Sequence, residues 1–348
     1  MEPNAPDTSN FLDWVEIKNF KSIKDLRLDC KRVNILIGKP NVGKSNILEA
    51  LGMLGADYSV GKFMDSVRYN KTSDLFYDND VKNDIVIQTS SYKATLVNFN
   101  LVNDICRYQF WNYFDKLMSD YFIDLQGAFE HSSVDEDLKH KIILSPVKKY
   151  DFINMQNFSG QFGDFLLPPF GRNLSAVINK YDDLFDEIAS LFEEQGLQLI
   201  LSERDQTFLL QKKEGMRVKQ YPFFAIADTF RRFMFYITAI ESNANSVIVF
   251  EEPEVHSFPP YTQELAYRMI EDEDNQYFIS THSPYMLHPF IEKMPYKDLN
   301  VFITYYENYQ TRVKALDYEE FRDILDYSTN VFFNLNHFTP DATNKVAP

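Results

Sequence analysis

The chain has 348 residues, of which 45% are hydrophobic and 25% are charged, so it can bury a core and is not disordered. Acidic residues outnumber basic ones by 51 to 35, for a formal charge of −16, which disfavours direct nucleic-acid binding. Cys30 and Cys106 are far apart, which excludes a disulfide scaffold and a cysteine-rich zinc site. A polar N-terminus and the lack of about 20 consecutive apolar residues predict a cytoplasmic protein without a membrane span.

The first hundred residues read as strands around one helix. Alternating apolar residues between Trp14 and Leu28 predict two short strands with a turn near Asn19–Ser22. The mainly apolar run Val33–Ile37 predicts a strand buried on both faces of a sheet. Helical spacing follows over Ser45–Leu54, and after an irregular polar segment two further strands are expected at 85–87 and 94–99.

The segment 101–215 is harder to interpret, although its apolar density never falls. We therefore expect it to be an insertion or subdomain rather than a linker. Its expected features are an aromatic run at 108–121, a loop at 145–164, a turn at 167–171, a helix at 174–195 and strands at 197–201 and 207–211.

The last third of the chain alternates between helices and strands. The expected elements are a helix at 225–242, a strand at 246–250, a helix at 260–271 and strands at 276–279 and 300–305. This alternation predicts an α/β fold with a mixed, largely parallel sheet. We expect an ATPase-core part at 13–100, the insertion at 101–215, and the second core part at 216–340.

The segment Gly38–Ser45 matches the phosphate-loop pattern GxxxxGK[ST] without a mismatch, between an expected buried strand and a helix. Such a loop turns backbone amides and a helix N-terminus toward phosphate. Lys44 is expected to reach the β- and γ-phosphates, and the Ser45 hydroxyl to ligate Mg²⁺. The predicted nucleotide-binding residues are Gly38, Lys39, Pro40, Asn41, Val42, Gly43, Lys44, Ser45 and Asn46.

Two adjacent carboxylates, Glu251 and Glu252, follow the expected strand at 246–250. The carboxyl edge of a parallel sheet is where ligands bind. One carboxylate could orient the water shell of Mg²⁺ while the other holds and polarises the attacking water. The alternative is a solvated acidic turn, since Glu254 is also close. The phosphate loop upstream favours the functional interpretation.

His282 follows the next expected strand, in the segment Ile279–Pro284. A single histidine after a strand is more often structural than catalytic. Its place on the neighbouring sheet edge predicts a hydrogen bond to the γ-phosphate.

These segments together resemble an ABC-type ATPase head of the OLD/SMC-like group, often grouped with AAA-family ATPases. The similar segments are VEIKNFKS at 15–22, GKPNVGKSNILEAL at 38–51, VIVFEEPEVHSFPP at 247–260, ISTHSPYML at 279–287 and DYSTNVFFNL at 326–335. The resemblance implies ATP sandwiched between two protomers, Glu252 as catalytic base, Glu251 on the Mg²⁺ side and His282 as γ-phosphate switch.

The sequence departs from the family pattern in two places. Glu251 stands where the family usually has aspartate, and the Ser-x-Gly signature expected near 224–229 is degenerate. Thr229, Asp228 or Arg231 are the candidates to replace it. The glutamine of the Q-loop is not identifiable, and 68–77 is its expected region.

The insertion is too short for the coiled coils of SMC proteins, and no Toprim nuclease domain follows the ATPase core. The resemblance therefore implies an oligomeric ATPase, a homodimer or larger, that controls a separate effector such as a nuclease. Anti-phage defence is the biological role that this resemblance implies. Two alternatives stay open at this point. One is a DNA repair or chromosome-maintenance ATPase that contacts DNA, and the other is a nucleotide-sensing scaffold with little turnover.

Overall fold

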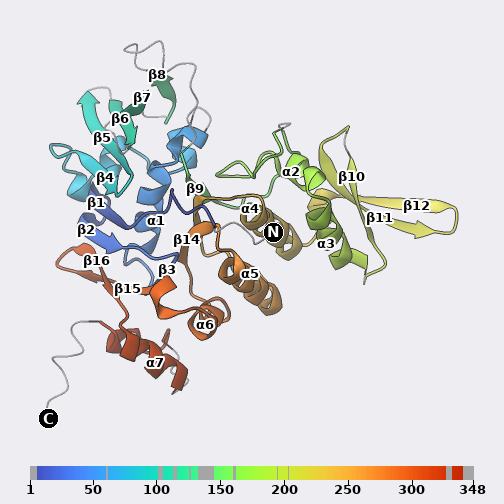
Figure 1. Cartoon of the computed structure of the whole chain (residues 1–348). Coiled ribbons are helices and arrows are strands. Elements are labelled where there is room, and N and C mark those ends of the chain that lie inside the picture. Colours follow the sequence, from blue (N-terminus) through green and yellow to red (C-terminus); the bar gives the residue numbers. More distant parts are fainter. Residues whose placement is uncertain are drawn as a thin grey trace.

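The computed structural model describes residues 6–59, 62–100, 105–112, 116–124, 127–131, 145–159, 162–193, 195–202, 204–326 and 331–339. Two large sheets enclose a central helix, and a narrow arm extends from one side (Figure 1).

The first sheet has six strands in the order β16-β15-β3-β14-β13-β9. The pairs β15–β3, β3–β14, β14–β13 and β13–β9 are parallel, and only β15–β16 is antiparallel. The central strands β3 and β14 are buried on both faces, which the apolar run at 33–37 predicts for β3. The strands are β3 Val33–Gly38, β9 Val147–Tyr150, β13 Ser246–Glu251, β14 Asn275–Ser280, β15 Leu299–Glu307 and β16 Gln310–Ala315.

The second sheet is antiparallel and has seven strands in the order β2-β1-β4-β5-β6-β7-β8. Its alternating burial, as in β4, fits a sheet with one face against the core. The strands are β1 Trp14–Phe20, β2 Ile23–Asp29, β4 Ile85–Thr89, β5 Tyr92–Asn100, β6 Ile105–Asn112, β7 Leu117–Ile123 and β8 Phe129–His131.

Helix α1, Lys44–Met53, lies between the two sheets (Figure 1). Its apolar side chains share one core with Val247 and Val249 of β13, whereas Ile248 and Phe250 face a second core. That second core is covered by α4 Asp228–Glu241, α5 Pro259–Glu271, α6 Pro284–Lys293 and α7 Tyr318–Asp326.

The arm consists of α2 Leu174–Lys180, α3 Asp182–Glu193 and the antiparallel strands β10 Gln198–Ser202, β11 Thr207–Glu214 and β12 Arg217–Pro222. The β11–β12 hairpin extends away from the body of the molecule (Figure 1). Every residue of β12 is exposed.

The predicted α/β fold with a mixed, largely parallel sheet is confirmed. Two local predictions were wrong. The expected loop at 145–164 contains β9, and the expected helix at 174–195 is split into two at Tyr181. The first part of 101–215 continues the antiparallel sheet. The sheets do not by themselves define domains, so the division at 101 and 215 stays a prediction. Of the similar segment at 326–335, residues 327–330 lie outside the described part.

Within the described residues, no helix is both long and apolar enough to cross a membrane.

Candidate functional site

The phosphate loop joins the carboxyl end of β3 to the first turn of α1. Lys44 is buried, and its Nζ donates hydrogen bonds of 3.0 Å to the carbonyl oxygens of both Gly38 and Lys39. The lysine therefore lies folded over the loop that it is predicted to serve. Helix α1 begins here without a side-chain cap, so its first N–H groups are available to an anion.

Gly43 has a φ of 101°, a conformation that residues with a side chain rarely adopt. A Cβ atom there would lie 2.0 Å from Thr311 Oγ1 and 2.8 Å from Ser22 Oγ. Both the backbone conformation and the close approach of two side chains therefore require glycine at this position.

Three side chains hold the phosphate loop, and we call them the clamp: Ser22 from the turn after β1, Asn46 from α1 and Thr311 from β16. Asn46 Nδ2 donates to Ser22 Oγ at 2.7 Å, and Ser22 Oγ lies 2.6 Å from Thr311 Oγ1. Thr311 Oγ1 donates to the Val42 carbonyl at 2.9 Å. Since the threonine proton is used there, the serine hydroxyl must donate to Thr311.

The second predicted group lies at the ends of β13 and β14. Glu252 has a φ of 44°, and its N–H donates to the Ser280 carbonyl at 3.0 Å. A left-handed non-glycine residue held by its neighbours is typical of functional sites. The structure brings Glu252 together with His282, whose Nε2 lies 3.4 Å from Glu252 Oε1.

The electrostatic environment couples this group to the phosphate loop. Burial and then the Lys44 ammonium lower the pKa of His282, whereas Glu252 acts in the opposite direction. Burial also lowers the pKa of Lys44, opposed by Glu252 and Glu251. The imidazole is therefore mainly neutral near pH 7 and has both a donor and an acceptor nitrogen.

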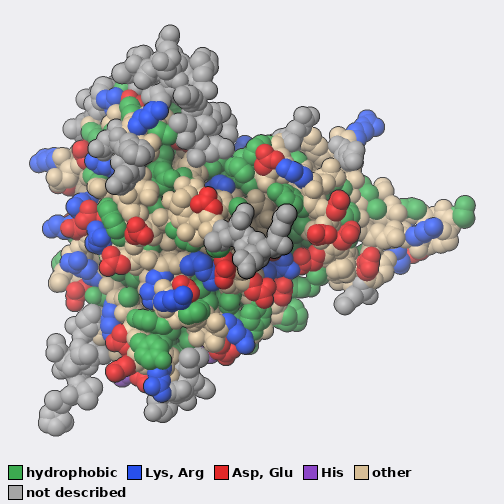
Figure 2. Space-filling model, viewed as in Figure 1, with side chains coloured by type: hydrophobic (Ala, Val, Ile, Leu, Met, Phe, Trp, Pro, Cys, Tyr) green, Lys and Arg blue, Asp and Glu red, His purple; other side chains and the backbone are tan. Residues whose placement is uncertain are grey.

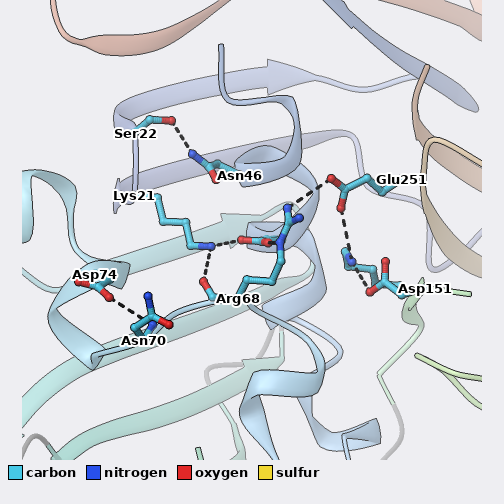
Figure 3. Close-up of polar contacts among 10 residues, drawn as sticks. Lys21, Ser22, Asn46, Arg68, Asn70, Asp74, Asp151 and Glu251 are labelled. Carbon is cyan, nitrogen blue, oxygen red and sulfur yellow. Dashed lines mark hydrogen bonds and ion pairs between the residues drawn. The ribbon is translucent and has the colours of Figure 1, made fainter. Parts of the chain in front are cut away.

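Glu251 contacts Arg68 rather than His282 (Figure 3). Its Oε1 lies 3.3 Å from Arg68 Nη2, and its Oε2 lies 3.9 Å from Lys149 Nζ. Arg68 lies in the region where the Q-loop was expected. Ser45 offers a hydroxyl oxygen and Glu251 a carboxylate oxygen as ligands for a metal ion. Mg²⁺ binds such oxygen ligands when phosphate and water complete its coordination shell.

Glu254, considered in the sequence only as part of an acidic turn, supports the histidine loop. Its Oε1 accepts hydrogen bonds from Thr281 Oγ1 at 2.6 Å and from the backbone N–H of His282 at 2.9 Å. Burial raises the pKa of Glu254. A carboxylate two residues after Glu252 was the available sequence signal, but its contact across to the next strand depends on the fold.

The degenerate signature region leads into α4, and its polar side chains have intramolecular partners. Asp228 pairs with both Arg231 and Arg232, at 3.4 and 2.7 Å. Thr229 Oγ1 donates to the His256 carbonyl at 2.8 Å. The candidate replacements for the missing signature serine are thus engaged within the chain.

Two cavities lie near the site, one at the phosphate loop and one beside Ser22 and Arg68. The larger, about 770 Å³, has Lys21, Ser22, Arg68, Asn70 and Asp74 in its wall. The smaller, about 310 Å³, is lined by residues that include Lys39, Val42, Thr304, Tyr306 and Asn336. The smaller cavity is lined by two residues of the phosphate loop, Lys39 and Val42, whereas the larger lies beside Ser22 of the clamp and Arg68.

Comparison with known proteins agrees with this architecture. Residues 11–157 match the family model of an AAA ATPase domain. The chain is 39% identical over 92 residues to an ATP/GTP phosphatase of Helicobacter pylori, covering 22% of this chain and 24% of that protein. It is 34% identical over 89 residues to an uncharacterized protein of Methanocaldococcus jannaschii, covering 22% and 41%. The chain thus matches less than half the length of each relative.

Two solved structures share the fold over most of the chain. An Smc head bound to the C-terminal winged-helix domain of ScpA superposes with a TM-score of 0.52 at 17% identity, covering 90% of this chain and all of that one. An Smc head with an extended coiled coil, derived from Pyrococcus furiosus and bound to the C-terminal domain of ScpA, gives 0.50 at 15% identity, covering 91% and 99%.

The fold is that of a P-loop, ABC-type ATPase head. The matched part of the chain, residues 11–157, corresponds to an ATPase domain.

Proposed function

We propose that this chain binds ATP at Gly38–Asn46 and hydrolyses it with Glu252 as general base. The observation that carries the proposal is the pairing of Glu252 with His282 at the sheet edge next to a glycine-dependent phosphate loop. A loop of this geometry with a carboxylate close by is the arrangement that phosphoryl transfer to water requires.

The chemistry follows from the proposed roles. Lys44 and the amides of the phosphate loop bind the β- and γ-phosphates. Glu252 accepts a proton from the water that attacks the γ-phosphorus, and the bond to the bridging oxygen breaks with its electron pair leaving on ADP. His282 donates a hydrogen bond to the γ-phosphate. Mg²⁺, held by Ser45 and Glu251, would neutralise charge on the β- and γ-phosphates.

Steady-state hydrolysis of ATP by three purified proteins tests this function. We expect turnover by the wild type, loss of nucleotide binding in Lys44→Ala, and retained binding with about 100-fold slower turnover in Glu252→Gln. If the wild type binds nucleotide but hydrolyses it no faster than the two variants, the result would instead support the nucleotide-sensing scaffold.

We further propose that the active unit is a homodimer or larger oligomer. The support is the resemblance to ABC-type heads, which bind ATP between two protomers. Asp228 and Thr229 have partners within this chain, so they would have to exchange these partners to contact ATP on a second protomer. Glu252→Gln with ATP should then form a larger species by light scattering. A monomer with and without ATP would contradict oligomerisation.

The finer assignment, an OLD-like ATPase that controls a separate effector in anti-phage defence, rests on the motif resemblance and on a cytoplasmic location that remains a sequence prediction. Co-purification from the native host followed by mass measurement tests it. Recovery of an associated nuclease would support the effector model, and recovery of the chain alone would count against it.

One observation favours the alternative of direct DNA contact. The β11–β12 hairpin carries four basic residues, Lys212, Lys213, Arg217 and Lys219, against one acidic residue, Glu214, in an otherwise acidic chain. Figure 2 shows the hairpin as the part that projects furthest to the right, with acidic side chains gathered near its base. Salt-sensitive DNA binding that is lost when the four basic residues are replaced by glutamine would support this alternative.

A further inference from the structure

The Mg²⁺-side carboxylate Glu251 belongs to a row of alternating charges (Figure 3). We call this row the charge chain, and its neighbours in order are Lys21, Glu49, Arg68, Glu251, Lys149 and Asp151. It connects the turn after β1 with α1, β13 and β9. Three cations and three anions compensate one another, so the row is neutral as a whole.

Glu49 anchors the charge chain. Its side chain is 1% exposed, and its two oxygens are taken by Lys21 Nζ and by Arg68 Nε, the latter at 2.5 Å. A buried carboxylate of this kind must keep its cations, because an uncompensated buried charge is strongly destabilising. Glu49 follows Ser45 by four residues on α1, so both lie on the same face of the helix.

Arg68 differs from the other cation beside Glu251. The Arg68 side chain is 69% exposed, although its Nε is fixed on Glu49. Lys149 is 6% exposed, bonds Asp151 and lies further from Glu251, at 3.9 Å. The planar guanidinium has several N–H donors, so it can bridge the two carboxylates and can release Glu251 while staying on Glu49.

We propose that Arg68 is a positioning residue that tunes divalent-metal affinity by holding Glu251 until the metal arrives. A divalent cation and a guanidinium compete for the same carboxylate. To bind Glu251, the metal must displace the 3.3 Å contact of Arg68 Nη2, which is longer than the contact of Arg68 Nε with Glu49. The released guanidinium then faces the adjoining cavity of about 770 Å³, in whose wall it already lies. This inference rests on the proposed metal-side role of Glu251.

The test compares binding of a non-hydrolysable ATP analogue with Mn²⁺ and in EDTA by calorimetry, using wild type, Arg68→Lys and Arg68→Gln. Both substitutions keep a donor that can reach Glu49 but lack the planar fork in which Nε contacts Glu49 while Nη2 contacts Glu251. We expect unchanged affinity in EDTA, and a Mn²⁺ enhancement about two- to fivefold larger than in wild type, the scale of one partly exposed ion pair. In a Glu251→Gln background the substitutions should have no effect on the enhancement.

An unchanged Mn²⁺ enhancement in both variants would overturn the role of Arg68. So would an equal loss of affinity with Mn²⁺ and in EDTA, which would mean that Arg68 contacts phosphate directly. If wild type binds the analogue under neither condition, the proposed ATP function itself fails, and the role of Arg68 fails with it. Thermal unfolding of each variant separates all of these outcomes from simple misfolding.

Discussion

At the scale of single residues, the phosphate loop depends most on Gly43. The neighbouring hydroxyls of Thr311 and Ser22 occupy the space that any side chain would need. Gly215 also has a positive φ, of 64°, but nothing lies within 4 Å of a Cβ placed there. The two glycines separate the effect of backbone conformation from the effect of crowding.

We therefore expect Gly43→Ala to abolish measurable ATP binding, whereas Gly215→Ala should cost about 1–2 kcal/mol of stability at most and leave binding intact. Calorimetric titration with ATP and urea unfolding measure the two effects. Equal behaviour of both variants would show that crowding at Gly43 is unimportant.

Glu254 gives a second prediction at this scale. Glu254→Ala removes the acceptor for Thr281 Oγ1 and the His282 N–H, leaving them unpaired at a cost of about 1–3 kcal/mol. We expect slower ATP turnover with a nearly unchanged KM, because the γ-phosphate histidine loses its support. Glu254→Gln, which retains an acceptor oxygen, should keep most of the activity.

The same carboxyl affects stability as a function of pH. Because burial raises the pKa of Glu254 above its ordinary 4.5, the native state binds more protons than the unfolded chain just above that pH. Stability should therefore fall as pH rises through this window. Glu254→Gln should show a smaller fall than wild type in denaturant titrations at pH 4.5–7, and an unchanged fall would contradict the assignment.

At the scale of elements, β16 matters because it brings Thr311 onto the phosphate loop. Thr311→Val keeps the shape but loses the bond to the Val42 carbonyl and the acceptor for Ser22. We expect a loss of about 1–2 kcal/mol in urea unfolding and a higher KM for ATP. Ser22→Ala is the matched control, since it leaves the Val42 bond in place and should raise KM less.

Prediction from the sequence succeeded best for elements with a single clear period. β3 and β13 were predicted from their mainly apolar runs, and α1 from its helical spacing. β9 was missed since its sequence, VKKY, has two lysines that are buried only because Asp151, Asn243 and Ser246 accept their hydrogen bonds. Asn243 and Ser246 lie 95 and 98 positions from Lys148, and partners that distant cannot be predicted from local pattern.

At the scale of the whole molecule, one buried lysine should leave a signature in stability. Burial lowers the pKa of Lys148 from 10.5 to about 7, so between these values the unfolded chain binds more protons than the native state. Stability contributed at this site should rise with pH through that window. Lys148→Met should lack this rise, so the Tm of wild type relative to that of the variant should increase from pH 7 to pH 9. The exposed Lys24→Met serves as control, and equal profiles for both variants would contradict the assignment.

The sequence by itself determined the phosphate loop, its flanking strand and helix, and the acidic pair and histidine after two later strands. These features can be predicted from local spacing, because the geometry of a strand, a loop or a helix fixes the direction of side chains that are close in sequence. Only the tertiary structure decided that Ser22 and Thr311, 289 positions apart, clamp Gly43, and that Arg68 reaches Glu251. Such contacts arise when two sheets close around α1, and their partners are set by packing rather than by neighbouring sequence.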